Sequence, residues 1–290
     1  MNEQVDFVTM SDREKYLYDL QGFLVVKGFL TDAEVKAAND ALDANEDKRS
    51  NFGPPHQTAE GLKGEFSSRT YGDILNWEKP WCEPFRDLIA HPKLIPYCNT
   101  MFGRGWRLDH GVSANSSVIG CEGLHLHGWG DAVLDGSRYY KFQNGRMRCA
   151  LTVFQFPLTD VNPGDGGLVV VPGSHKANYP LPDYVRMYEA DHEIFHNPPV
   201  KAGDMVIFNE ATTHGTLPWK GKQERRALYY RYVPKYFNWI PAAYETTQPD
   251  WISELTEAQQ AVMEPPYVYG HPLINDDAET VERPRLDQRL

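Results

Sequence analysis

The chain has 290 residues, of which 41% are hydrophobic and 24% are charged, and these proportions are typical of a soluble globular protein with a packed core. Its formal net charge of -11 argues against nucleic acid or an anionic membrane as a partner, because the average field repels both. No apolar run approaches the roughly eighteen residues that a membrane-spanning helix requires, which excludes an integral helical membrane protein.

The N-terminal region predicts a helix, a strand and a second helix. Ser11 followed by Glu14 fits a capping box that begins a helix through Leu20, and Gly22 ends it. The segment 23–30 is apolar and predicts a buried strand, and Thr31 with Glu34 forms a second capping box for a helix through about residue 45.

The middle of the chain changes from loops to a helix and then to strands. Residues 46–81 are rich in glycine, proline and polar residues and predict loops, whereas 84–102 has a helical pattern. Several short β-prone runs then follow, with turn signals between them, which predicts a sandwich or a barrel. These runs are 106–110, 112–119, 124–127, 148–158, 167–171, 205–209 and 227–233. A helix is expected over 253–263, and a charged, proline-containing tail follows it.

We expect a single domain, 1–290, since mainly β proteins of this length are often one unit. Its predicted parts are a helical and loop support at 1–105, a β core at 106–235, and a helix with a tail at 236–290. Four scattered cysteines without a C-x-x-C pair, and an N-terminus without a basic and apolar signal segment, predict a reducing, cytoplasmic setting.

A histidine pattern carries the main functional signal. Residues at i and i+2 of a strand point to the same face, so His125 and His127 can reach one metal ion. His214 supplies a third ligand from elsewhere in the fold, and Arg225 is placed to bind a carboxylate. The pattern predicts a metal-dependent oxygenase with an organic acid as co-substrate.

Together with the segments Leu168–His175 and Lys201–Phe208, these residues resemble the phytanoyl-CoA dioxygenase family of iron(II)- and 2-oxoglutarate-dependent oxygenases. The resemblance extends from Gly22 to about Pro234. It implies a mainly β fold with flanking helices, a double-stranded β-helix of the jelly-roll, cupin-like type. It also implies that His125 is similar to the first ligand and His214 to the distal one, with His127 where the family has an aspartate. His175, in a Pro-Gly-Ser-His turn, is expected to have a structural role.

The histidine at position 127 leaves three interpretations open. His127 ligates directly and gives a three-histidine site; or it turns aside and leaves a position for chloride or water, as in related halogenases; or Asp131 or Glu122 supplies a carboxylate, or the metal has been lost. The first interpretation is favoured.

The resemblance further implies iron(II), 2-oxoglutarate and O2 as cofactor and co-substrates. Arg225 would bind the distal carboxylate of 2-oxoglutarate, with Thr216 nearby, and Arg226 would point to the opposite face of the strand. The predicted function is hydroxylation, or a related C–H oxidation, of a small-molecule substrate. The alternatives are a three-histidine metal enzyme that does not use 2-oxoglutarate, a halogenase-like variant, and a non-catalytic binding protein on the same fold.

Overall fold

The helix, strand and helix predicted for the N-terminal region are present, with both capping boxes. The computed structural model describes residues 10–128, 138–239 and 249–284; it contains helix α1 (Asp12–Gln21), strand β1 (Phe23–Val26) and helix α2 (Asp32–Ala44). Ser11 and Thr31 each accept a backbone N–H from the glutamate three residues later, and that glutamate accepts the backbone N–H of the cap. Gly22 is left-handed, with φ 80°, and turns the chain from α1 into β1.

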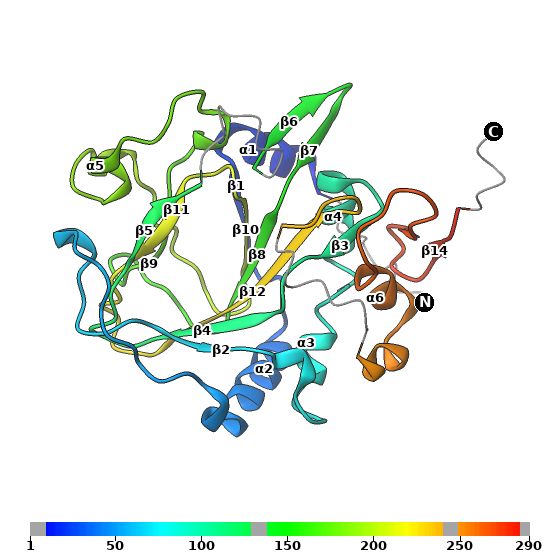
Figure 1. Ribbon diagram of the computed structural model, residues 1–290, viewed down its shortest axis with the longest axis horizontal. Helices are drawn as coiled ribbons and strands as arrows, with labels where there is room; N and C mark the ends of the chain where they lie inside the picture. The colour runs from blue at the N-terminus through cyan, green and yellow to red at the C-terminus, as the bar shows by residue number, and fades with distance from the viewer. Residues whose placement is uncertain (1–9, 129–137, 240–248, 285–290) are drawn as a thin grey trace, which may run out of the picture.

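Two antiparallel sheets build the body of the molecule (Figure 1). The larger sheet has the order β1-β10-β8-β12-β4-β2, with β3 beside β12. Its further strands are β2 (Arg69–Tyr71), β3 (Trp106–Leu108), β4 (Ser113–Ser117), β8 (Thr152–Pro157), β10 (Met205–Asn209) and β12 (Arg225–Pro234). The smaller sheet has the order β5-β11-β9, with strands β5 (Leu124–His127), β9 (Gly167–Val170) and β11 (His214–Leu217).

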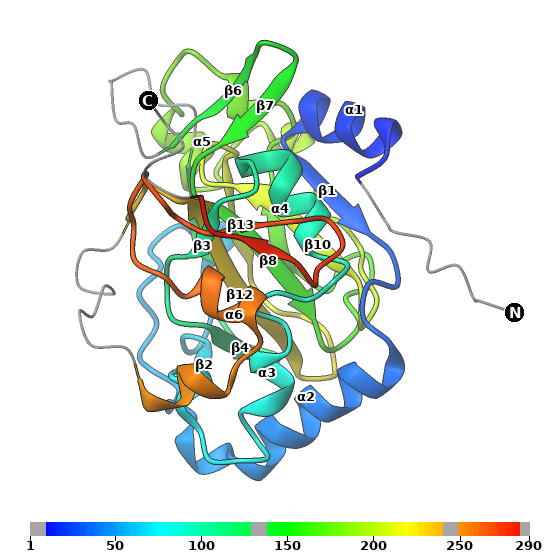
Figure 2. The same ribbon diagram turned by 90° about the vertical axis from the view of Figure 1, so that its right-hand side faces the viewer.

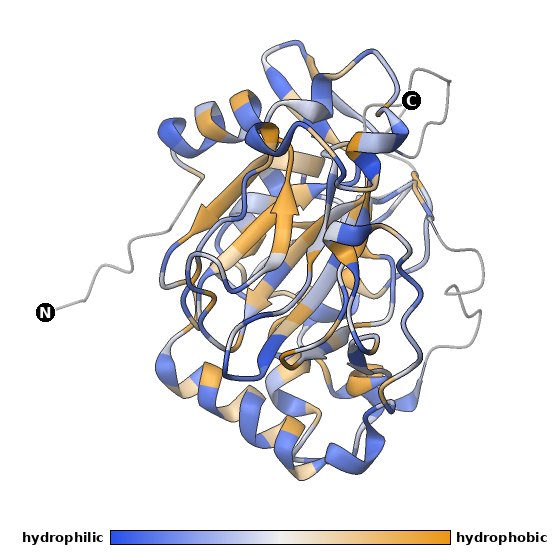
Figure 3. Cartoon of the chain, turned by 90° about the vertical axis from the view of Figure 1, so that its left-hand side faces the viewer, coloured by the Kyte–Doolittle hydropathy of each residue, from blue (hydrophilic) through white to orange (hydrophobic). Residues whose placement is uncertain are grey.

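One apolar core lies between the two sheets, and a second lies between the larger sheet and the helices that cover it. The inner core joins both sheets, with Phe23, Val153, Val206 and Phe208 from the larger sheet and Val170 from the smaller one. Figure 2 shows helices on the outer face of the larger sheet, and Figure 3 shows the apolar strands between more hydrophilic surface segments. The remaining elements are α3 (Glu83–Arg86), α4 (Ile95–Phe102), α5 (Asp183–Arg186), α6 (Glu257–Val262), the hairpin β6 (Tyr140–Gln143) with β7 (Arg146–Cys149), and β13 (Leu273–Ile274) with β14 (Val281–Glu282). This architecture confirms the predicted fold class, mainly β with flanking helices.

Several element predictions need correction. The helix predicted over 84–102 is two short helices, α3 and α4, because turns occupy the residues around Pro92 between them. The helix predicted over 253–263 is also divided, since Thr256 caps α6 and a short 3-10 helix, Asp250–Glu254, precedes it. Strands β2, β6 and β11 were not predicted from the sequence, and β11 carries His214.

Hydrogen bonds fasten the N-terminal region and the turn after β9 to the loop before β11. The Thr212 hydroxyl donates to the Gly22 carbonyl at 2.7 Å, and the Ser174 hydroxyl accepts the Thr213 N–H at 2.7 Å. His175 donates from Nε2 to the Asp19 carbonyl at 3.0 Å, which is the structural role predicted for it. A Cβ at Gly22 would lie 2.4 Å from His175 Nδ1, so only glycine fits there. The start of the chain therefore helps to position the strand that bears His214.

No helix within the described ranges is long and apolar enough to cross a membrane.

Candidate metal and co-substrate site

His127 and His214 are brought together by the pairing of β5 with β11. They are direct register partners across the two strands, and their ring centroids are 4.2 Å apart. His214 is buried on the central strand of the smaller sheet, between β5 and β9. Two imidazoles on adjacent strands thus point to one place inside the fold.

Both rings are oriented by the backbone in the same way. The Nδ1–H of His127 donates to the His125 carbonyl at 3.1 Å, and the Nδ1–H of His214 donates to the Thr212 carbonyl at 2.7 Å. Each Nε2 is therefore left with a free lone pair, which is the arrangement that metal-ligating histidines use. Burial, and then the proximity of His214, hold the pKa of His127 well below its usual value, so this ring is neutral at physiological pH.

Glu210 adds a carboxylate to the two histidines. Possible ligand atoms of His127, Glu210 and His214 all lie within 4.8 Å of one another, and Glu210 Oε1 is 3.9 Å from His214 Nε2. Glu210 was not singled out from the sequence. It follows β10 directly and precedes His214 by four residues, so an acidic residue at the end of an apolar strand was the available signal.

The structure does not bring His125 into this group. Its ring centroid is 6.2 Å from that of His127, and among the described residues the cluster of possible ligands contains Glu210 instead. The pairing of β5 with β11 is irregular here, because His214 opposes His127 whereas Thr216 opposes Leu124. Such a bulge interrupts the alternation on which the i and i+2 argument depends.

The other carboxylates considered from the sequence have different positions. Glu122 is buried, and its Oε2 accepts the backbone N–H groups of His56 at 2.7 Å and Gln57 at 2.8 Å. It therefore holds a loop and is not part of the histidine cluster. Asp131 lies outside the described residues.

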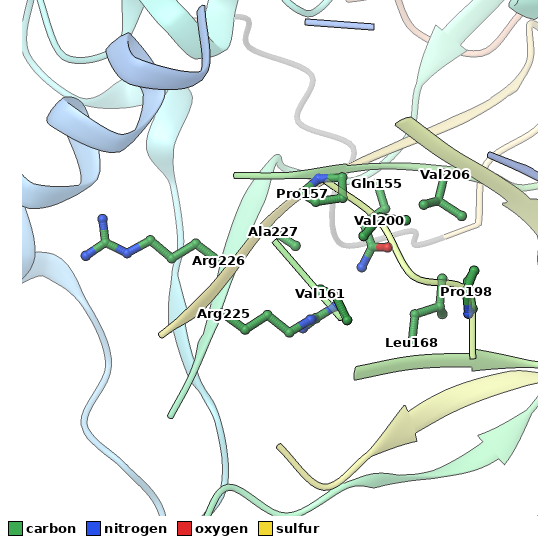
Figure 4. A pocket seen from close by; sticks show the side chains of 10 residues that line it. All are labelled: Gln155, Pro157, Val161, Leu168, Pro198, Val200, Val206, Arg225, Arg226 and Ala227. Atoms are coloured by element: carbon green, nitrogen blue, oxygen red, sulfur yellow. The ribbon is translucent and has the colours of Figure 1, made fainter. Parts of the chain in front are cut away.

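Arg225 is buried at the start of β12 and points into a narrow cavity between the sheets, whereas Arg226 points away from it, as predicted (Figure 4). Arg226 instead pairs with Asp43 at 2.7 Å and with Glu224 at 2.9 Å. Arg225 Nη2 donates to the Tyr229 hydroxyl at 3.2 Å, while its buried Nε has no hydrogen-bond partner among the described residues. Burial alone would raise the pKa of Tyr229, but the charge and hydrogen bond of Arg225 lower it.

Gly167 lets the guanidinium approach β9. A Cβ at this position would lie 2.9 Å from Arg225 Nε, and Gly167 has φ 80°. Thr216 lies two residues after His214 and opposes Leu168, the neighbour of Gly167. On β9, Val170 opposes His214, and Gly167 lies against Arg225. These two residues are three positions apart, so Arg225 reaches β9 about 10 Å along the strand from the histidine pair. A five-carbon keto-diacid is long enough to span this distance.

The donor set fits a divalent transition metal. Two imidazoles and one carboxylate match the donor set of the facial triad typical of non-haem iron(II) oxygenases, which keeps positions open for other ligands. Arg225 Nε, which has no hydrogen-bond partner among the described residues, is suited to a carboxylate inside the narrow cavity that this arginine lines.

A family model and several solved structures are similar to this chain. The family model of phytanoyl-CoA dioxygenase (PhyH) matches residues 18–227. The fold is similar to that of HygX from Streptomyces hygroscopicus with nickel and 2-oxoglutarate bound, with a TM-score of 0.65, 23% identity, and coverage of 79% of this chain and 88% of that chain. The search of curated proteins found no match.

Two structures from nogalamycin biosynthesis are also similar. The non-haem α-ketoglutarate-dependent epimerase SnoN has a TM-score of 0.56 and 18% identity, with 92% of this chain and 96% of that chain covered. The carbocyclase SnoK, of the same cofactor class, has a TM-score of 0.56 and 18% identity, with 85% and 91% covered. Since the family model covers most of the chain, the chain belongs to the phytanoyl-CoA dioxygenase (PhyH) family and, as its sequence predicted, is an iron(II)- and 2-oxoglutarate-dependent oxygenase.

Proposed function

We propose that this oxygenase oxidises a C–H bond of a small-molecule substrate, with hydroxylation as the default outcome, and that His127, Glu210 and His214 hold its iron. The observation that carries the ligand set is the convergence of their possible ligand atoms within 4.8 Å. The shared Nδ1–H to carbonyl bonds support it further, because they leave both Nε2 atoms available.

Arg225 and Thr216 are the proposed residues for the co-substrate. The guanidinium of Arg225 would bind the distal carboxylate of 2-oxoglutarate. This carboxylate would accept a hydrogen bond from the buried Nε, which has no partner among the described residues. Thr216 lies on β11 opposite Leu168, which lines the same cavity as Arg225. When bound, iron and 2-oxoglutarate use O2 to oxidise the substrate, and 2-oxoglutarate is converted to succinate and carbon dioxide.

A small-molecule substrate is consistent with the similar structures. HygX has been solved with hygromycin B together with nickel and 2-oxoglutarate. SnoN and SnoK are described as an epimerase and a carbocyclase, so this fold supports outcomes other than hydroxylation.

The three-histidine site predicted from the sequence remains the competing ligand set. It requires His125 to join His127 and His214 at one ion, in place of Glu210. A halogenase-like site, which needs an open position instead of a carboxylate, is less compatible with Glu210 beside the histidines.

Anaerobic titration tests the proposal. Protein purified without a histidine tag should bind one iron(II), and 2-oxoglutarate should then produce a visible charge-transfer band. Exposure to O2 should release succinate. Absence of both the band and succinate release would contradict the proposed function, and full activity of the Arg225→Gln variant would favour an enzyme that does not use 2-oxoglutarate.

A further inference from the structure

A second arginine of β12, Arg231, lies on the same strand face as Arg225 and Ala227, which line the narrow cavity. Alternate residues of a strand share a face, so Arg231 is on the side of Arg225 and Tyr229. Tyr230 and Tyr232, on the opposite face of β12, belong to the outer, helix-covered core. Arg231 is partly buried, and its guanidinium lies over the Tyr229 ring, 5.4 Å from the centroid.

The strand registers place Arg231 at the level of the metal ligands. Arg231 opposes Val153 on β8, and Val153 opposes Phe208 on β10. The Phe208 ring is 4.6 Å, centroid to centroid, from that of His214. With strands about 4.8 Å apart, the Arg231 backbone is only about 10 Å from that of Phe208. Arg225 is six residues away along the same strand, about 20 Å, at the narrow cavity that it lines.

Within the described ranges, no carboxylate forms an ion pair with Arg231. Its side chain makes no hydrogen bond or ion pair with any residue that the structure describes; burial lowers its pKa, and the carboxylates of Glu210 and Asp109 oppose this shift only from a distance. Asp109 Oδ1 already accepts hydrogen bonds from Arg107 at 3.3 Å and from the Trp239 N–H at 2.8 Å. Glu210 belongs to the metal cluster.

We propose that Arg231 binds a carboxylate of the substrate, so that the substrate of this oxygenase is an organic acid held beside the metal. This proposal deepens, and rests on, the proposed function. A partly buried guanidinium without a hydrogen-bonded partner is unfavourable, and a bidentate carboxylate would satisfy it with two charge-assisted bonds. The protein has a net charge of -11, so an anionic substrate needs such a local positive group to bind. Arg225 then anchors the co-substrate, and Arg231 selects and orients the substrate.

Ligand-observed NMR on protein loaded with zinc(II) and 2-oxoglutarate tests this assignment, since zinc prevents turnover. The probes are benzoate and hexanoate, each compared with its neutral amide, benzamide and hexanamide. Wild-type protein should bind the carboxylates more tightly than the amides. Arg231→Gln should weaken carboxylate binding at least about tenfold and leave amide binding within about twofold. Arg231→Lys should be intermediate, because it keeps the charge and loses the fork.

The matched control is Arg146→Gln, which removes an exposed arginine on β7. It should leave the carboxylate preference unchanged, and unfolding curves should show that the Arg231 variants remain folded. The proposal is overturned if wild-type protein has no preference for the carboxylates, or if the preference survives in Arg231→Gln.

The 2-oxoglutarate titration of the iron(II) protein separates the remaining possibilities. Arg231→Gln should leave the affinity for 2-oxoglutarate unchanged; a tenfold loss would assign the guanidinium to the co-substrate and overturn the proposal. Failure of the proposed function would be visible separately, as the absence of the charge-transfer band in wild-type protein.

Discussion

His127 and His214 oppose each other across β5 and β11, with ring centroids 4.2 Å apart, and each donates its Nδ1–H to the carbonyl of the residue two before it. The backbone thereby fixes both the tautomer and the direction of the two rings. A ligand pair held in this way needs little rearrangement to receive a metal ion. The proposed third ligand is Glu210, whose carboxylate lies within reach of both histidines.

Glu210→Ala should lower the affinity for iron(II) at least about tenfold, because it removes the only anionic oxygen of the cluster within the described residues. His125→Ala should leave the affinity within about threefold. Competition with a chelator, followed by metal analysis, measures both. A large loss in His125→Ala with little change in Glu210→Ala would favour the three-histidine site.

Arg225→Gln should weaken 2-oxoglutarate binding by about 10- to 100-fold while iron(II) binding is retained, because charge-assisted hydrogen bonds contribute roughly 1.5 to 3 kcal/mol each. The charge-transfer band at increasing 2-oxoglutarate gives the affinity directly. Arg226→Gln removes the neighbouring, outward-pointing arginine and serves as the control for binding. Equal effects of the two substitutions would argue against the role of Arg225.

Gly167→Ala should also weaken 2-oxoglutarate binding, although residue 167 carries no charge. The new Cβ would lie 2.9 Å from Arg225 Nε, and the backbone has φ 80°, so the arginine or the strand must shift. Gly111→Ala is the matched control, since a Cβ there meets no atom within 4 Å. Unchanged 2-oxoglutarate affinity in a folded Gly167→Ala protein would show that this close approach does not position Arg225.

The stability of the protein should fall in acid, in part because of His175. Burial lowers its pKa from 6.5 to about 4, so between these values a proton binds the unfolded chain more readily than the folded one. The free energy of unfolding should therefore decrease as the pH falls from about 6.5 towards 4, by up to about 1.4 kcal/mol per pH unit from this group. Urea unfolding at several pH values measures the slope.

His175→Gln should give a shallower slope of stability against pH, whatever its effect on stability at pH 7. The substitution also removes the hydrogen bond to the Asp19 carbonyl, and this loss lowers stability by the same amount at every pH. It therefore does not affect the slope, which is the quantity compared. An unchanged slope would mean that other groups account for the acid sensitivity.

Much of the fold could be predicted because its signals are local. The capping boxes at Ser11 and Thr31 fixed the starts of α1 and α2, and the apolar run at 205–209 matched β10 without error. The opposite directions of Arg225 and Arg226 follow from strand alternation alone. Strand β11 escaped prediction because its sequence, His-Gly-Thr-Leu, has no apolar pattern and is held by two neighbouring strands.

The proposed metal cluster was only partly predictable, for a different reason. The i and i+2 rule assumes regular pairing, whereas β5 and β11 change register between His214 and Thr216. Glu210 approaches from the turn after β10, and its position depends on which strands become neighbours, not on its sequence neighbours. The single-domain organisation and the cytoplasmic location stay predictions.

The bond between Thr212 and Gly22 joins residues 190 positions apart, next to the strand that carries His214. During synthesis, Gly22 can form this bond only after Thr212 has been made, when more than two thirds of the 290 residues have been translated. The support that the N-terminal region gives to the loop before β11 can therefore form only after translation has passed Thr212, and a truncation that removes α1 and β1 would remove this support while leaving every proposed metal-binding side chain in the sequence.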